Sequence, residues 1–137
     1  GTPFETLVEQ IKAVNDNMSD ARARLIARDQ TGKLQGLISK AQQTSIGMTT
    51  YYFMTAHDEK TRGNPRGKYP RAISHWDLDG MLCAWSNNSV YSDDLGVTWK
   101  QRPSSWIHLA PGMDIQCRCT SAPSWNNFLN SMDKELV

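Results

Sequence analysis

Carboxylate, imidazole, guanidinium and thiol side chains gather in three short stretches of this chain. They are Asp58-Glu59-Lys60-Thr61-Arg62, His75-Trp76-Asp77-Leu78-Asp79-Gly80 and Cys117-Arg118-Cys119. Such groups cost free energy to bury without partners, and a hydrophobic core does not need them. The three stretches therefore indicate either a functional site or a set of polar contacts that fastens the fold.

Acid-base chemistry would centre on His75. Asp77 and Asp79 share its face in an extended segment, and Asp79 still does so in a helix. A carboxylate beside an imidazole fixes its tautomer, and the pair can act as a general base, a metal-binding unit or a hydrogen-bonded brace. The candidate catalytic residues are His75, Asp58, Arg62 and Asp79.

Metal chemistry would centre on Cys117 and Cys119, whose thiols share a face if the segment is extended. A disulfide between cysteines two residues apart would be strained, whereas thiolate binding of zinc is chemically easier. Two thiols are half a zinc site, and no zinc-finger spacing is present, so unliganded buried cysteines are the alternative. Ligands that could complete the site are Cys83 and His75, then His57 and His108.

Phosphate binding would centre on the segment from Lys60 to Arg71, which contains five cations and no acid. Flexible basic loops can contact nucleic-acid phosphates, although many are only solvated faces. The formal net charge of the chain is +1, so any attraction to nucleic acid must be local. The candidate nucleic-acid contacts are Lys60, Arg66, Lys68 and Arg71.

Two helices are predicted before these stretches. Apolar residues at three- and four-residue spacing predict a helix over 4–17, and Ser19 caps a second one over 20–43. The apolar face of the second helix contains Leu25, Ile26, Leu34, Leu37, Ile38 and Ala41. Gly32 and Gly36 within it indicate either close packing of another backbone or a kink.

Short strands follow the helices. Aromatic and β-branched residues predict a strand over 49–55, and shorter strands are expected at 81–85 and 97–100, with a polar turn at 86–89. A loop over 60–72 and a last helix over 124–134 complete the pattern. This order predicts an α+β fold, with N-terminal helices packed on a small, mainly antiparallel sheet with long loops and a C-terminal helix.

The composition agrees with one globular domain over residues 1–137, with 39% apolar and 21% charged residues. No apolar run is long enough to span a membrane, and the first residues lack the pattern of a signal peptide. Three cysteines without such a signal favour a reducing compartment or a metal role. Phosphate-binding glycine loops and hydrolase or zinc-protease motifs are absent, so no cofactor is expected, with zinc the one open possibility.

The order of the motifs resembles a known family. An Ala-Arg helix at 23–29 leads to Thr55-Ala56-His57-Asp58-Glu59 and Arg62, followed by His75 with Leu78-Asp79-Gly80, and a Pro-Gly loop leads to Cys-Arg-Cys. Over about residues 21–122 this set is similar to the C-terminal domain of the phage Mu protein F-like family of minor head (head morphogenesis) proteins. The gap between Arg62 and His75, which carries the basic loop, is longer than is usual in that family.

The resemblance implies a few-copy component of a tailed-phage virion, located in the head and in the host cytoplasm during assembly. Its implied partners are portal or capsid proteins and packaged DNA, and its implied role is head assembly or DNA retention and delivery. It also implies that the chain is a C-terminal fragment of a longer protein. The matching polar residues form an expected structural cluster: Arg28, Asp58, Arg62, His75, Asp79, Cys117, Arg118 and Cys119.

Three hypotheses therefore stand beside one another. In the first, Arg62 and Arg118 bridge Asp58 and Asp79 as an internal clip of a structural and interaction module. In the second, a nuclease-like or nucleotide-directed enzyme uses His75 as base and Arg62 to hold phosphate. In the third, zinc bound by Cys117, Cys119, Cys83 and His75 stabilises a binding module.

Overall fold

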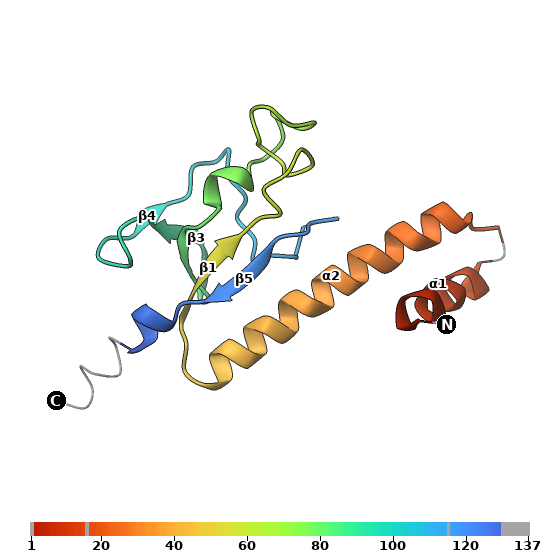
Figure 1. The fold of residues 1–137 in the computed structure, drawn as a ribbon, viewed down its shortest axis with the longest axis horizontal. Coiled ribbons are helices and arrows are strands. Elements are labelled where there is room, and N and C mark those ends of the chain that lie inside the picture. The colour runs from red at the N-terminus through yellow and green to blue at the C-terminus, as the bar shows by residue number, and fades with distance from the viewer. Residues whose placement is uncertain (1, 16, 115, 130–137) are drawn as a thin grey trace.

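A long helix crosses one side of a small antiparallel sheet in the computed structural model, which describes residues 2–15, 17–114 and 116–129 (Figure 1). The elements in chain order are α1 (Pro3–Val14), α2 (Asp20–Ser45), β1 (Thr50–Met54), the 3-10 helix η1 (Trp76–Leu78), β2 (Leu82–Ala84), β3 (Asn87–Ser92), β4 (Lys100–Gln101) and β5 (Thr120–Pro123). The fold is α+β, as the sequence predicts.

Side-chain caps start both N-terminal helices. Thr2 accepts a hydrogen bond from the backbone N–H of Glu5 at 3.1 Å, and Ser19 accepts one from that of Arg22 at 3.2 Å. The first helix ends at Val14, three residues earlier than predicted, whereas α2 continues without a break to Ser45. Val8 packs against Ala23 and Ala27, so α1 and α2 share a small core of their own.

The two glycines of α2 mark close packing and not a kink. A Cβ atom on Gly36 would lie 2.7 Å from the carbonyl oxygen of Pro111, and one on Gly32 would lie 3.3 Å from that of Cys117. The backbone at Pro111 and at Cys117 therefore lies directly against this stripe of the helix. The absence of side chains on the stripe is what permits that approach.

The apolar face predicted for α2 does not face the core. The helix buries small and polar residues instead: Ala23 and Ala27 pack against α1, and Gln43 forms hydrogen bonds with Ser121 and Trp85 of the sheet region. The larger apolar side chains are exposed: Leu25 by 47%, Leu34 by 58%, Leu37 by 56% and Ile38 by 46%.

The sheet has the strand order β4-β3-β2-β1-β5, and all neighbouring strands are antiparallel. β1 and β2 fall where the sequence predicts strands. β3 begins at Asn87, inside the predicted turn, β4 is only two residues long, and β5 was not predicted as a strand. The core against the sheet contains Tyr51, Phe53, Leu78, Cys83, Trp85, Ile107 and Cys119.

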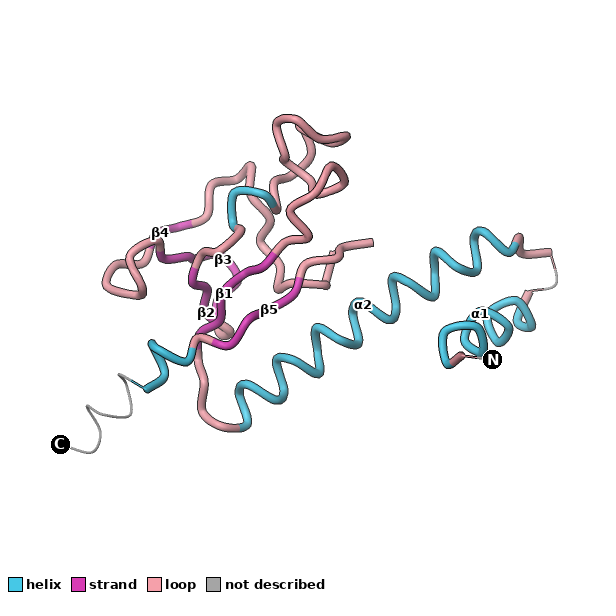
Figure 2. Tube along the Cα trace, viewed as in Figure 1, coloured by secondary structure: helices cyan, strands magenta, loops and turns pink. Residues whose placement is uncertain are grey.

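Long loops connect the strands, as Figure 2 shows for the segments between β1 and η1 and between β4 and β5. Residues 125–129 are helical, and the rest of the predicted helix over 124–134 lies outside the described residues. Ser124 joins this end to the sheet, because its hydroxyl donates to the carbonyl oxygen of Thr50 at 2.7 Å. None of the described helices has the length and apolarity that a membrane crossing requires.

Candidate functional site

His75 lies between two thiols and a carboxylate, next to the start of η1. Its Nδ1 is 3.3 Å from Sγ of Cys119 and 3.6 Å from Sγ of Cys117, and its Nε2 is 3.1 Å from Oδ2 of Asp114. The backbone N–H of His75 donates to the carbonyl oxygen of Arg62 at 2.9 Å, which fixes the residue against the loop that follows β1. The imidazole is buried, and both of its nitrogens have partners.

Asp114 is a site residue that the sequence analysis missed. It holds His75 and also accepts from Nη1 of Arg62 at 2.8 Å. The carboxylates predicted to accompany His75 lie elsewhere, because η1 turns them away from the ring. Asp77 accepts from the Ser74 hydroxyl at 2.6 Å, and Asp79 pairs with His57 Nδ1 at 3.1 Å.

The predicted clip is present in part. Arg118 Nη2 donates to Oδ1 of Asp58 at 2.8 Å, and this hydrogen bond is the main reason that the pKa of Asp58 is lowered to about 2. The two side chains are 50% and 40% exposed, so the pair lies at the surface and not inside. Arg62 pairs with Asp114, so the expected bridge through Asp79 is replaced by a second, separate ion pair.

The third cysteine does not join the other two. His75, Cys117 and Cys119 have ligand atoms within 4.8 Å of one another, and Cys83 is not part of that group. Cys83 lies in the core on β2, where burial raises its pKa. The hydrogen bond that Cys119 shares with Cys117 lowers the pKa of Cys117 and raises that of Cys119.

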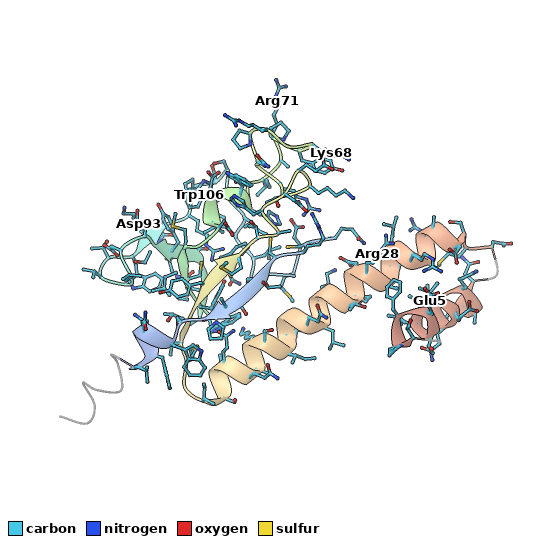
Figure 3. All side chains as sticks on the ribbon, viewed as in Figure 1. Glu5, Arg28, Lys68, Arg71, Asp93 and Trp106 are labelled. Carbon is cyan, nitrogen blue, oxygen red and sulfur yellow. The ribbon has the colours of Figure 1, made fainter. Side chains whose placement is uncertain are left out.

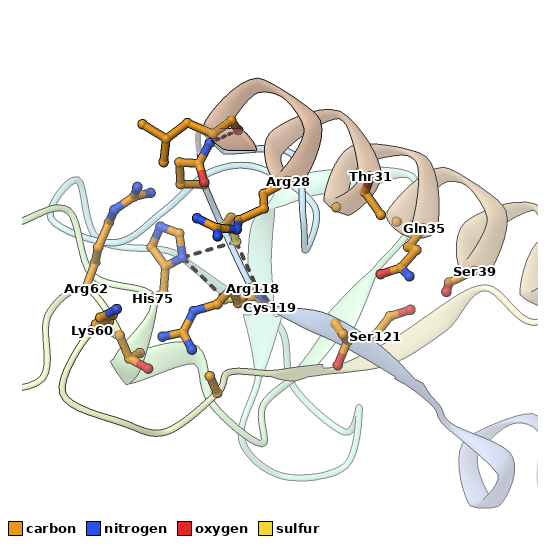
Figure 4. Close-up of a pocket in the computed structure, with 18 of the residues that line it drawn as sticks. Arg28, Thr31, Gln35, Ser39, Lys60, Arg62, His75, Arg118, Cys119 and Ser121 are labelled. Carbon is orange, nitrogen blue, oxygen red and sulfur yellow. Dashed lines mark hydrogen bonds between the residues drawn. The ribbon is translucent and has the colours of Figure 1, made fainter. Parts of the chain in front are cut away.

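The thiols and His75 line a cavity of about 1040 Å3 between α2 and the sheet (Figure 4). Four of its lining residues are cations, and no carboxylate is present among the described residues that line it. The cations come from the helix, the loop after β1 and the segment before β5, and they are Arg28, Lys60, Arg62 and Arg118. Since Arg62 and Arg118 already pair with Asp114 and Asp58, the excess positive charge that suits the cavity to an anionic ligand comes from Arg28 and Lys60.

The remaining basic residues lie outside this cavity. Arg66, Lys68 and Arg71 are exposed on the loop between β1 and η1, and Figure 3 shows Lys68 and Arg71 at its outer end. Lys68 lies 3.5 Å from Glu59, which is a weak surface ion pair. Of the predicted polar cluster, Arg28, Arg62, His75, Cys117, Arg118 and Cys119 meet at the cavity.

Two histidines proposed as additional ligands have other contacts. His57 stacks on Trp76 with ring centroids 4.1 Å apart, and His108 Nε2 lies 3.1 Å from the carbonyl oxygen of Pro103. Neither belongs to the group formed by His75 and the two thiols.

Comparison with known proteins gives one family. The sequence model of the family described as "Phage Mu protein F like protein" matches residues 1–122. An uncharacterized protein of Haemophilus influenzae is 27% identical over 127 residues, and the match covers 93% of this chain. It covers 22% of that protein, so the chain spans about a fifth of the length of this relative. No solved structure matches the chain.

Proposed function

This chain belongs to the phage Mu protein F-like family, and from that membership we propose that it is part of a minor head protein of a tailed phage. In this role it binds the portal or capsid proteins and acts in head assembly or in the retention and delivery of packaged DNA. The observation that carries the proposal is the match over residues 1–122, which includes both N-terminal helices, the sheet up to Ala122 and the cavity between α2 and the sheet. The ordered motifs of the sequence lead to the same family.

An exposed apolar stripe on α2 supports an interaction role. Leu34, Leu37 and Ile38 follow three- and four-residue spacing on a helix, so they form one continuous patch. Contiguous exposed apolar residues are typical of surfaces that bind other proteins. We assign this patch, the α2 stripe, to the contact with a portal or capsid protein.

The proposed presence of the protein in the phage head is tested on purified heads. Heads from a phage that encodes the full-length protein are separated on a density gradient, and their proteins are quantified by mass spectrometry. We expect the protein in the heads at a small fraction of the copy number of the major capsid protein. Its absence from DNA-filled, infectious heads would overturn the proposal.

The contact surface is tested with the full-length protein. Replacing both Leu34 and Ile38 with Asp should reduce its incorporation into heads at least tenfold, because charges would enter an apolar interface. Val97→Asp is the matched control, since Val97 is 81% exposed and lies in the turn before β4. Circular dichroism checks that the variants fold, and normal incorporation of the double variant would exclude the α2 stripe as the contact.

A nuclease-like reaction has weaker support in the geometry. A general base needs a free nitrogen within reach of its substrate, but His75 is 2% exposed and both nitrogens are occupied. The same protein incubated with plasmid DNA or RNA, with and without divalent metal, should therefore leave both intact. Cleavage that disappears in His75→Ala would establish the enzymatic alternative.

A further inference from the structure

Three ligand atoms of the types that zinc prefers converge at the edge of the cavity. Tetrahedral geometry, with bonds of about 2.3 Å to sulfur and 2.0–2.1 Å to nitrogen, places nitrogen and sulfur ligands about 3.6 Å apart. Nδ1 of His75 lies 3.3 Å from Sγ of Cys119 and 3.6 Å from Sγ of Cys117. We propose that His75 Nδ1, Cys117 Sγ and Cys119 Sγ bind Zn2+, with the fourth coordination position open to the cationic cavity.

Asp114 prepares the imidazole for this role. Its carboxylate accepts a hydrogen bond from Nε2 at 3.1 Å, so the proton belongs on Nε2 and the lone pair of Nδ1 faces the sulfurs. Arg62 in turn holds Asp114 at 2.8 Å. A carboxylate on the outer nitrogen of a histidine is the usual arrangement around protein-bound zinc, where it orients the ring and raises its basicity.

The backbone around the thiols also fits a thiolate site. The N–H of Cys119 lies 3.4 Å from Sγ of Cys117, where a hydrogen bond would stabilise negative charge on sulfur. Gln116, between Asp114 and Cys117, donates its N–H to Asp29 on α2 at 2.9 Å. The backbone next to Cys117 is thus fastened to the helix, which restricts the movement of this thiol.

Among the described residues no fourth ligand joins this group, and we assign the fourth position to an external ligand. Cys83 is held in the core and is not within reach of the other three groups. All three ligand residues line the cavity, together with Arg28, Lys60, Arg62 and Arg118. A metal with one open position beside several cations favours an anionic oxygen ligand, and inorganic phosphate is the simplest probe of that class.

Metal content is the first test, and it does not depend on the proposed role in the phage head. The chain is purified under reducing conditions, loaded with Zn2+, dialysed and analysed by mass spectrometry of elements. We expect about one zinc per chain, and a loss of at least tenfold in Cys117→Ser and Cys119→Ser. Cys83→Ala is the matched control and should keep its zinc. Substoichiometric zinc in the wild type, or equal zinc in all variants, would overturn the site.

Cobalt gives a second readout that does not rely on the variants being equally stable. Co2+ added to the wild-type chain should produce thiolate-to-cobalt charge-transfer absorption and the visible bands of tetrahedral cobalt. Cys83→Ala should give the same spectrum. Asp114→Asn should keep the spectrum but weaken zinc binding 10- to 100-fold in competition with a chelator, because it acts through His75. A spectrum without thiolate bands would exclude the two sulfurs as ligands.

The open position is tested on the cobalt-loaded protein. Inorganic phosphate should shift the visible bands with a saturable dependence, and Arg28→Gln should weaken that binding roughly tenfold or more through loss of a charged partner. Sulfate at equal ionic strength separates phosphate binding from a general salt effect. Visible bands that do not respond to either anion would show that the fourth position is closed.

Discussion

His75 and its neighbours form the centre of the site at the scale of single residues. A buried imidazole is stable only when its nitrogens are satisfied, and here a carboxylate occupies one side and two sulfurs occupy the other. The surface pair between Arg118 and Asp58 is different, because water competes for both side chains. The buried contacts of His75 should therefore contribute more to the stability of the fold than the exposed pair of Arg118 and Asp58 does.

Arg118→Ala should lower the free energy of unfolding by no more than about 1 kcal/mol, the usual upper limit for an exposed ion pair. Urea denaturation followed by circular dichroism measures this change. Arg66→Ala is the control, since Arg66 is an exposed cation on the loop beyond the cavity. A loss far above this limit would show that Arg118 fastens the interior, as the clip hypothesis expects.

The pH dependence of Asp58 follows from the same pair. Because the pKa of Asp58 is lowered to about 2 from an ordinary value of 3.8, the contact stabilises the folded state above about pH 4. That contribution is lost as the pH falls through the folded-state value. Carbon NMR of the carboxyl group should give a midpoint near 2 in the wild type and a higher midpoint, closer to 3.8, in Arg118→Ala. Equal midpoints in the two proteins would contradict the assignment of the shift to Arg118.

Of the side chains that contact the imidazole of His75, the sequence identifies Cys117 and Cys119 but misses Asp114. His75, Cys117 and Cys119 stand out because histidine and cysteine are scarce and chemically distinctive. Asp114 is one acid among many and lies 39 residues from His75, so its pairing depends on how the loop before β5 crosses α2. Local spacing contains no information on that crossing.

At the scale of elements, two glycines of α2 determine how closely the site residues approach the helix. Gly32 and Gly36 allow the segment that carries Asp114 and the thiols to lie against the helix. The packing at Gly36 is the tighter of the two, because a Cβ atom there would lie 2.7 Å from a backbone carbonyl oxygen, compared with 3.3 Å at Gly32.

Gly36→Ala should lower the free energy of unfolding by about 1–3 kcal/mol, because overpacking outweighs the gain of roughly 1 kcal/mol in helix propensity. Lys40→Ala, on the exposed side of the same helix, should be neutral or slightly stabilising. Thermal and urea denaturation compare the two variants. A stabilised Gly36→Ala protein would mean that the backbone at Pro111 does not lie against this stripe.

Val8→Ala should release α1 without unfolding the sheet. Val8 is 1% exposed in the small core that joins α1 to α2, and the truncation costs about 2 kcal/mol of local stability. Hydrogen exchange should show lost protection in α1 and unchanged protection in β1 and β2. Val14→Ala is the control, since Val14 is 88% exposed. A uniform loss of protection would instead indicate a single cooperative unit.

Periodicity explains which elements could be predicted. The repeat in α2 and the aromatic run in β1 give strong signals, and both elements are found where they are expected. β3 begins with Asn and Ser residues that are typical of turns, and β5 is short and ends in Pro, so only pairing with their neighbours makes them strands. The buried face predicted for α2 was wrong, because the residues that the helix buries are small or polar and its large apolar side chains are exposed.

At the scale of the whole molecule, charge is uneven although its sum is small. Arg66, Lys68 and Arg71 are exposed on the loop between β1 and η1, whereas the cations of the cavity lie between α2 and the sheet. If the loop contacts packaged DNA, each phosphate contact adds about 0.9 to the slope of log affinity against log salt.

Replacing Arg66, Lys68 and Arg71 together with Gln should therefore reduce that slope by about 2 to 3 and weaken binding to DNA of any sequence. Fluorescence anisotropy over a range of salt concentrations measures both quantities. Arg22→Gln combined with Lys40→Gln removes two exposed cations from α2 and serves as the control. An unchanged slope in the triple variant would exclude the loop as a DNA contact.

The 26 residues of α2 form a rod about 39 Å long, with α1 packed near its start and β1 following its end. Such a rod fixes both the spacing and the rotational phase between its two ends. One residue inserted between them would turn α1 by about 100° around the axis while lengthening the rod by only about 1.5 Å. Any assembly that grips both ends would thus tolerate changes of side chain along α2 far better than a change in its length.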